Sequence, residues 1–231
     1  MRQGIRKHYF DEDYFEIIDT EEKAYWLGFI AADGCIIKSS EYNSYRLYIN
    51  IGEKDKDHLE LFRRCIKADD VKIQEYINTS GYSSKNGTIT SRIVLNSYKM
   101  CMDLKKYNIH ERKSFDIQLP DIRDDLMPHY LRGYFDGDGC YCIYYSNDIG
   151  KNRVSFELVG ASYMFMLEVQ NYFSKNNIKT NIYHRKRNDS YRLMTCSKKQ
   201  VLNLTDFVYK NSSISLSRKQ EKINEIKNIA A

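Results

Sequence analysis

The sequence lacks an apolar run long enough to cross a membrane, and it lacks an N-terminal apolar segment of the secretory type. We therefore expect neither membrane insertion nor secretion. The cysteines lack the paired spacing of a zinc site, because Cys140-x-Cys142 stands without a second pair. We expect reduced and mostly buried thiols in an intracellular protein.

A large charge excess is also missing. The chain has 36 basic and 31 acidic side chains and a net charge of +5, which does not by itself indicate a nucleic-acid partner. Basic residues are concentrated between Lys179 and Arg192, where Asp189 is the one acidic residue. Such a strip would attract a polyanion, but a solvated surface hairpin has the same composition. Hydrophobic residues make up 42% of the chain, which is enough for real cores.

The sequence repeats itself once. Residues 24–34 read A-Y-W-L-G-F-I-A-A-D-G, and residues 129–139 read H-Y-L-R-G-Y-F-D-G-D-G. Asp33 and Asp138 lie 105 positions apart, and two later Arg-containing segments match at offsets of 107 and 106. The repeat predicts an N-terminal half at 1–115, a linker at 116–128 and a C-terminal half at 129–231.

Each half predicts the same order of elements: helix, two strands, helix, two strands, helix. Asp55 and Ser162 are expected to cap the middle helices, 56–66 and 163–176. This order indicates an α+β fold with antiparallel sheets. The expected strand pairs are 35–39 with 45–52, 71–78 with 88–95, 140–146 with 152–159, and 178–186 with 190–196.

Strand alternation assigns the faces of these sheets. Leu47, Ile49 and Ile51 share one face and are expected to pack on helices, whereas Arg46, Tyr48 and Asn50 share the other. A polar face of this kind can be simply solvated. Two such faces related by a pseudo-dyad could instead line a groove for duplex DNA, which has matching symmetry.

The first helix of each half is apolar nearly all round, so it should be buried. Small residues recur four positions apart on each helix: Gly28 with Ala32, and Gly133 with Gly137. This spacing allows close approach of two backbones. We expect the two helices to pack on each other at the pseudo-dyad.

Each of these helices ends in Asp-Gly. Gly34 and Gly139 suit a left-handed position after a helix, and the pattern by itself is an ordinary turn. However, Asp33 and Asp138 would each lie at the negative end of a helix dipole, and helix packing would bring the two carboxylates together. The pair therefore predicts a cation, and oxygen ligands favour magnesium.

The segments W-L-G-F-I-A-A-D-G and L-R-G-Y-F-D-G-D-G resemble the two copies of the motif that names the LAGLIDADG homing endonucleases. The resemblance covers nearly the whole chain and implies a single-chain saddle of two antiparallel sheets around a central two-helix interface. It implies that Asp33 and Asp138 are catalytic and hold metal, together with neighbouring main-chain carbonyls such as those of Ala32 and Gly137. Asp136 has Ala31 as its counterpart, so a structural role is expected for it.

The resemblance also implies one basic residue from the end of each half. Lys113 and Lys219 fit, because each follows an arginine and lies 80 or 81 residues after its aspartate. Either could also be an ordinary surface lysine, but the matched Arg-Lys context favours the functional role.

The implied activity is site-specific hydrolysis of one phosphodiester per strand of double-stranded DNA, across the minor groove of a long asymmetric target. Mg²⁺ is the implied cofactor, with Mn²⁺ able to substitute and Ca²⁺ binding without cleavage. A monomer is expected, in the cytoplasm for a prokaryotic or phage gene and in an organelle for a eukaryotic one. The expected DNA-contacting residues are Arg46, Tyr48, Asn50, Arg92, Arg153, Arg185, Arg187 and Arg192.

Two other interpretations stay open from the sequence. An RNA maturase or a non-cleaving DNA-binding protein could have the same fold, and a zinc-stabilised structural protein is a more distant alternative. The five histidines are scattered and give no other nuclease motif.

Overall fold

The computed structural model describes residues 8–39, 44–79, 87–148 and 150–230. The first half contains α1 (Glu21–Asp33), β1 (Gly34–Lys38), β2 (Tyr45–Gly52), the 3-10 turn η1 (Glu53–Asp55), α2 (Lys56–Cys65), β3 (Gln74–Asn78), β4 (Thr88–Asn96), α3 (Tyr98–Lys106) and the 3-10 turn η2 (Lys113–Phe115). The second half contains α4 (Met127–Asp138), β5 (Gly139–Ser146), β6 (Lys151–Gly160), α5 (Tyr163–Lys175), β7 (Asn181–Arg185), β8 (Ser190–Thr195), α6 (Lys198–Tyr209) and α7 (Ser217–Ala230).

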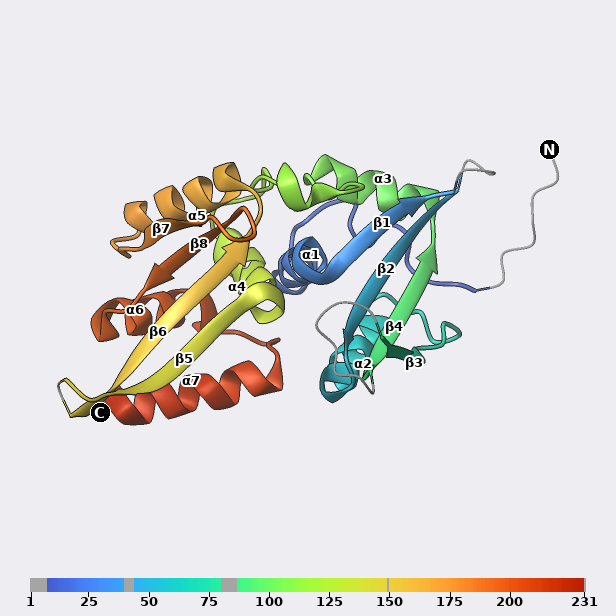
Figure 1. Ribbon diagram of the computed structural model, residues 1–231. Helices are drawn as coiled ribbons and strands as arrows, with labels where there is room; N and C mark the ends of the chain where they lie inside the picture. The colour runs from blue at the N-terminus through green and yellow to red at the C-terminus, as the bar shows by residue number, and fades with distance from the viewer. Residues whose placement is uncertain (1–7, 40–43, 80–86, 149, 231) are drawn as a thin grey trace.

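The strands form two antiparallel sheets with equivalent orders, β1-β2-β4-β3 and β5-β6-β8-β7. Figure 1 shows α1 and α4 in the centre, with one sheet on either side. The predicted α+β fold with two repeats is therefore confirmed. Strand alternation is confirmed as well, since Leu47, Ile49 and Ile51 are buried while Arg46 is exposed.

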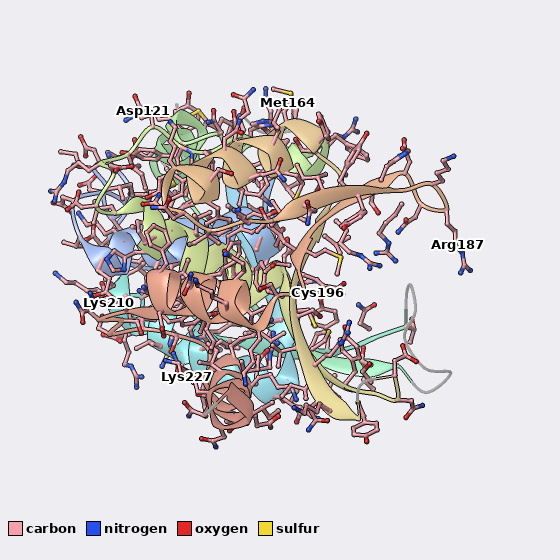
Figure 2. The ribbon with its side chains drawn as sticks, turned by 90° about the vertical axis from the view of Figure 1, so that its left-hand side faces the viewer. Asp121, Met164, Arg187, Cys196, Lys210 and Lys227 are labelled. Atoms are coloured by element: carbon pink, nitrogen blue, oxygen red, sulfur yellow. The ribbon has the colours of Figure 1, made fainter. Side chains whose placement is uncertain are left out.

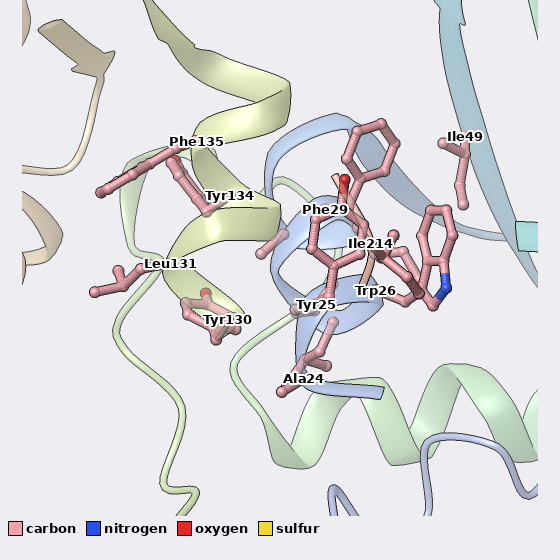
Figure 3. Close-up of a cluster of buried hydrophobic side chains, with 14 of the residues drawn as sticks. Ala24, Tyr25, Trp26, Phe29, Ile49, Tyr130, Leu131, Tyr134, Phe135 and Ile214 are labelled. Atoms are coloured by element: carbon pink, nitrogen blue, oxygen red, sulfur yellow. The ribbon is translucent and has the colours of Figure 1, made fainter. Parts of the chain in front are cut away.

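The central helices cross with their backbones in contact. A Cβ added at Gly28 would overlap the carbonyl oxygen of Tyr130, and one added at Gly133 would overlap that of Tyr25. Aromatic rings close the interface around the glycines (Figure 3), and Phe29 is 1% exposed. The small residues therefore remove the side chains that would hold the two helices apart.

The prediction of a left-handed backbone at Gly34 and Gly139 is wrong. Gly34 has a φ of −83° and Gly139 a φ of −77°, because β1 and β5 begin directly at these residues. A Cβ at Gly34 would lie 2.5 Å from the carbonyl oxygen of Ile30, and one at Gly139 would lie 2.7 Å from that of Phe135. Glycine is therefore favoured by the close return of the chain over the helix end.

The two predicted helix caps differ in outcome. Ser162 accepts a hydrogen bond of 3.2 Å from the main-chain nitrogen of Phe165, so its role as N-cap of α5 is confirmed. Asp55 makes no capping hydrogen bond to α2 and instead forms an ion pair of 2.9 Å with Arg218. The carboxylate of Asp55 therefore pairs with Arg218, a distant residue that the local sequence cannot predict.

Two further expectations are corrected. The repeat did not predict α7, which follows α6 in the second half and carries Lys219. The thiols are free, but Cys101 is the buried one, whereas Cys35, Cys140 and Cys196 are exposed on or beside the strands. Among the described residues, no helix combines the length and apolar character needed to span a membrane.

Candidate active site at the paired helix ends

Asp33 and Asp138 are the last residues of α1 and α4, so the crossing of these helices brings the two carboxylates to the same end of the interface. An added Cβ at Gly137 would lie 2.6 Å from the Cβ of Ala32 and 2.7 Å from Oδ2 of Asp33. The Asp33 carboxylate therefore lies across the interface from the residue that directly precedes Asp138.

The surroundings disfavour two negative charges at this point. Loss of solvent raises the pKa of Asp33 to about 7, and the charge of Asp138 adds to this rise. Burial also raises the pKa of Asp138, although its residue is exposed overall; the charge of Lys113 acts in the opposite direction. Each pKa is therefore shifted toward the neutral acid, as expected where a compensating cation belongs.

Two lysines occupy equivalent places beside these carboxylates. The Nζ atom of Lys113 donates to the carbonyl oxygen of Gly34, and that of Lys219 donates to the carbonyl oxygen of Gly139. Their residues are 7% and 6% exposed, so neither is an ordinary surface lysine. Burial lowers the pKa of both amines, and for Lys113 the charges of Cys35, Asp138 and Asp33 oppose this effect.

A pocket lies on each side of the helix pair. One is lined by Asp33, Gly137, Asn50, Asp55 and Arg218, among others. The other is lined by Asp138, Ala32, Lys113, Ser114 and Gly160, among others. Each aspartate thus faces its own opening, together with residues that the other half supplies. Two pockets, each lined by one of two neighbouring aspartates, suit a substrate with two reacting groups.

Asp136 was expected to be structural, and its contacts show how. The residue is fully buried and accepts hydrogen bonds from the hydroxyls of Tyr25 and Tyr209 and from the main-chain nitrogen of Leu216. Tyr25 also bonds to Nε2 of His58, at 2.8 Å. These partners lie up to 111 residues away in the sequence, so the repeat alone did not predict them.

The expected DNA-contacting residues of the first half lie together on the open face of their sheet. Arg92 donates a hydrogen bond of 2.6 Å to Oδ1 of Asn50, and its guanidinium lies 4.2 Å from the ring centroid of Tyr76. Arg46 donates to the hydroxyl of Tyr48 at 3.5 Å. Tyr76 was not among the expected residues, but its alternation on β3 could have identified it.

The second half presents its basic residues differently. Arg153 and Arg185 are exposed on β6 and β7, and Arg187 lies at the tip of the β7–β8 hairpin, which projects from the body (Figure 2). Arg192 is half-buried and forms an ion pair of 3.4 Å with Glu157. Arg153, Arg185 and Arg187 are therefore exposed, whereas Arg192 is held by Glu157.

The carboxylate oxygens of Asp33 and Asp138 suit magnesium, which prefers oxygen ligands, better than zinc, which is typically held by sulfur and nitrogen. No group of three or more His, Cys, Asp or Glu side chains gathers in a metal-binding arrangement among the described residues. The Sγ atoms of Cys140 and Cys142 lie 3.6 Å apart without such a third partner. Magnesium commonly takes one or two carboxylates and completes its shell with water and substrate phosphate, which matches Asp33 and Asp138.

Several solved structures share this fold. The LAGLIDADG homing endonuclease I-LtrWI bound to target DNA superposes with a TM-score of 0.60 at 15% identity, over 95% of this chain and 91% of that chain. I-GzeII in complex with its DNA target superposes with a TM-score of 0.57 at 13% identity, over 90% and 89%. At these identities the likeness shows the fold, a saddle of two sheets around two central helices.

One curated relative is the probable translation initiation factor IF-2 of Methanocaldococcus jannaschii, which is 24% identical over 219 residues. The match covers 87% of this chain but only 16% of the initiation factor. The chain thus spans a small part of the length of that relative.

The sequence profile of the LAGLIDADG-like domain matches twice, at residues 20–102 and 125–208. Each match begins just before a central helix and includes its Asp-Gly end and the following four strands. With two matched copies in one polypeptide around a paired-helix interface, the chain belongs to the LAGLIDADG family.

Proposed function

We propose that this protein is a site-specific endonuclease that hydrolyses one phosphodiester in each strand of double-stranded DNA. The observation that carries the proposal is the pairing of Asp33 and Asp138 at the ends of two crossed helices, each with a buried lysine beside it. Two equivalent acid–lysine sets at a pseudo-dyad suit two scissile phosphates of opposite strands, which approach each other across the minor groove.

Asp33 and Asp138 would hold Mg²⁺, with the main-chain carbonyls of Ala32 and Gly137 close by. When bound, the metal supplies charge stabilisation on the phosphoryl oxygens and a more acidic attacking water. Lys113 and Lys219 add fixed positive charge where negative charge develops in the transition state. Because each ammonium is already bonded to a glycine carbonyl, its position is set before substrate arrives.

The open faces of the two sheets would read the major groove on either side of the cut. Arg46, Tyr48, Asn50 and Arg92 supply the first face, and Arg153, Arg185, Arg187 and Arg192 supply the second. Arginine and asparagine are suited to bidentate contacts with guanine and adenine. Two sheets would span roughly 20 base pairs, about two turns of B-DNA. The two faces differ in their side chains, because Asn50 pairs with Arg92 on the first and Glu157 pairs with Arg192 on the second. This difference predicts an asymmetric target.

We further propose that the protein acts as a monomer divided at 1–115, 116–128 and 129–231, since one polypeptide supplies both aspartates and both lysines. Mn²⁺ is expected to replace Mg²⁺, and Ca²⁺ to support binding alone.

The direct test is selection of cleaved sites from a randomised double-stranded DNA library with Mg²⁺. The expected result is one long asymmetric site, cut on both strands. The Asp33→Asn/Asp138→Asn protein should bind the selected site in Ca²⁺ but leave it uncut in Mg²⁺. Binding by the natural protein without any cutting in Mg²⁺ or Mn²⁺ would instead assign it to the non-cleaving DNA-binding or maturase class.

A further inference from the structure

Asp136 forms a link between the helix interface and the start of α7. Its carboxylate accepts the main-chain N–H of Leu216 at 2.7 Å, besides the hydroxyls of Tyr25 at 2.7 Å and Tyr209 at 2.6 Å. Leu216 directly precedes α7, and it is itself 3% exposed. A buried carboxylate thus fixes the residue from which α7 departs.

The same link continues to Lys219. The carbonyl oxygen of Leu216 accepts from the main-chain nitrogen of Lys219 at 2.9 Å and from that of Gln220 at 3.2 Å. At its other end, Lys219 donates from Nζ to the carbonyl of Gly139. The main chain of Lys219 is therefore linked to Asp136 through Leu216, and its side-chain amine is bonded directly to Gly139.

The first half reaches the same geometry at its lysine without such an acid. Ala31 occupies the position equivalent to Asp136. Lys113 lies in the turn η2, directly after Arg112, whose φ of 60° is left-handed. Its Nζ atom nevertheless makes the equivalent contact, with Gly34. The two lysines are thus positioned by different means, so they can be disturbed one at a time.

We propose that Asp136 is a positioning residue for Lys219 alone, and that it thereby sets the cleavage rate of one DNA strand relative to the other. The proposal rests on the nuclease function proposed above. Removal of the carboxylate releases Leu216 and the first turn of α7, and the amine of Lys219 loses its fixed place beside Gly139. Lys113, tied to Gly34 through η2, keeps its place, so one strand is still cut at the normal rate.

The test compares two proteins that both lack the hydroxyls of Tyr25 and Tyr209 and that differ only at Asp136. Asp136→Ala copies the residue of the first half, but the buried Tyr209 hydroxyl loses its acceptor, and the Tyr25 hydroxyl keeps His58 as its one remaining partner. The triple variant Asp136→Ala/Tyr25→Phe/Tyr209→Phe removes those hydroxyls and so avoids most of that cost. Its matched control is Tyr25→Phe/Tyr209→Phe, which keeps Asp136 on Leu216. Asp136→Asn retains an acceptor for Leu216 and is expected to restore the natural behaviour.

The first readout needs no DNA. Amine acetylation of each folded protein is followed by mass spectrometry at Lys219 and Lys113. Loss of Asp136 should speed modification of Lys219 by about fivefold or more through local opening, while Lys113 stays unchanged. Equal rates at Lys219 in the triple variant and its control would overturn the proposal.

The second readout follows each strand of the target with its own end label. The triple variant should accumulate nicked DNA, with one strand slowed by about tenfold or more and the other unchanged. Equal slowing of both strands would also overturn the proposal. If the natural protein cuts no DNA, the nuclease function fails, and the acetylation result still decides the role of Asp136.

Discussion

Arg132 on α4 is fully buried, and its guanidinium forms an ion pair of 2.7 Å with Glu21 in the first turn of α1. The same guanidinium donates to the carbonyl oxygens of Ile214 and Val208. One cation therefore joins the central helices to the chain around α6. Glu21 also accepts the main-chain N–H of Ser213, which ties the same region to α1.

The variant Glu21→Ala is expected to destabilise the protein by about 3–5 kcal/mol, because it leaves a buried guanidinium without its counter-charge. Urea unfolding followed by circular dichroism measures the change. Glu75→Ala is the matched control, since it removes an exposed ion pair with Lys56 and should cost less than about 1 kcal/mol. Equal effects of the two variants would contradict a structural role for the buried pair.

Gly28→Ala is expected to prevent normal folding or to destabilise the protein by more than about 3 kcal/mol. The new Cβ would overlap the carbonyl of Tyr130, and neither helix backbone can move without disturbing the other contacts of the interface. Gly52→Ala is the control, because an added Cβ there meets no atom within 4 Å. Thermal melting of both proteins gives the comparison, and a Gly28→Ala protein that melts like Gly52→Ala would refute the close backbone contact.

We expect Asp33 to make the metal-free protein less stable at high pH than at low pH. Its pKa rises from 3.8 to about 7 on folding, so the folded state resists ionisation more than the unfolded chain does. The destabilisation is absent below pH 3.8, grows as the pH rises toward 7, and is complete above it.

Asp33→Asn should therefore stabilise the metal-free protein at pH 8 by about 1–3 kcal/mol, and the gain should vanish near pH 4. Denaturant unfolding in chelator at both pH values measures it. Asp148→Asn, in the exposed turn between β5 and β6, should change stability at neither pH. A gain for Asp33→Asn that is equal at pH 8 and pH 4 would show that the ionisation is not its cause.

Lys113→Met and Lys219→Met should each slow cleavage by about 100-fold or more while leaving the affinity for target DNA in Ca²⁺ nearly unchanged. The methionine keeps most of the buried side chain but lacks the terminal ammonium that now donates to the glycine carbonyl. Single-turnover cleavage and gel-shift binding separate the two effects. Lys222→Met, at an exposed pair with Glu225, should cut normally. Loss of binding in parallel with cleavage would mean that the lysines merely hold DNA.

The helix interface was predictable from sequence because its signals are local. All-apolar helices, small residues four apart and a repeated Asp-Gly end are visible within 11 residues, and they place Asp33 and Asp138 correctly at the ends of α1 and α4. The Arg-Lys pairs gave Lys113 and Lys219 by the same repeat, although only the structure shows their contacts with Gly34 and Gly139.

The remaining features depend on contacts between distant segments. Arg132 lies in a helix whose pattern is apolar, and its partner Glu21 is 111 residues away. Asp55 resembles a helix cap but is bound by Arg218, which lies 163 residues away. Among the described residues of the first half, no helix corresponds to α7, so the repeat could not predict it. For Arg132 and Asp55, a long-range partner overrides the local preference.

The glycine-to-carbonyl contacts of α1 and α4 fix the spacing between the helix ends that carry Asp33 and Asp138. Main-chain atoms make the contact at Gly28 and Gly133, so the spacing does not depend on the side chains that cover the sheets. In the proposed nuclease, residues such as Arg46 or Arg187 could then change with the sequence being recognised, while the distance between the two cuts would stay the same. For the proposed nuclease, recognition of a new DNA sequence would therefore require changes on the sheet surfaces alone, and the stagger between the broken strands would stay the same.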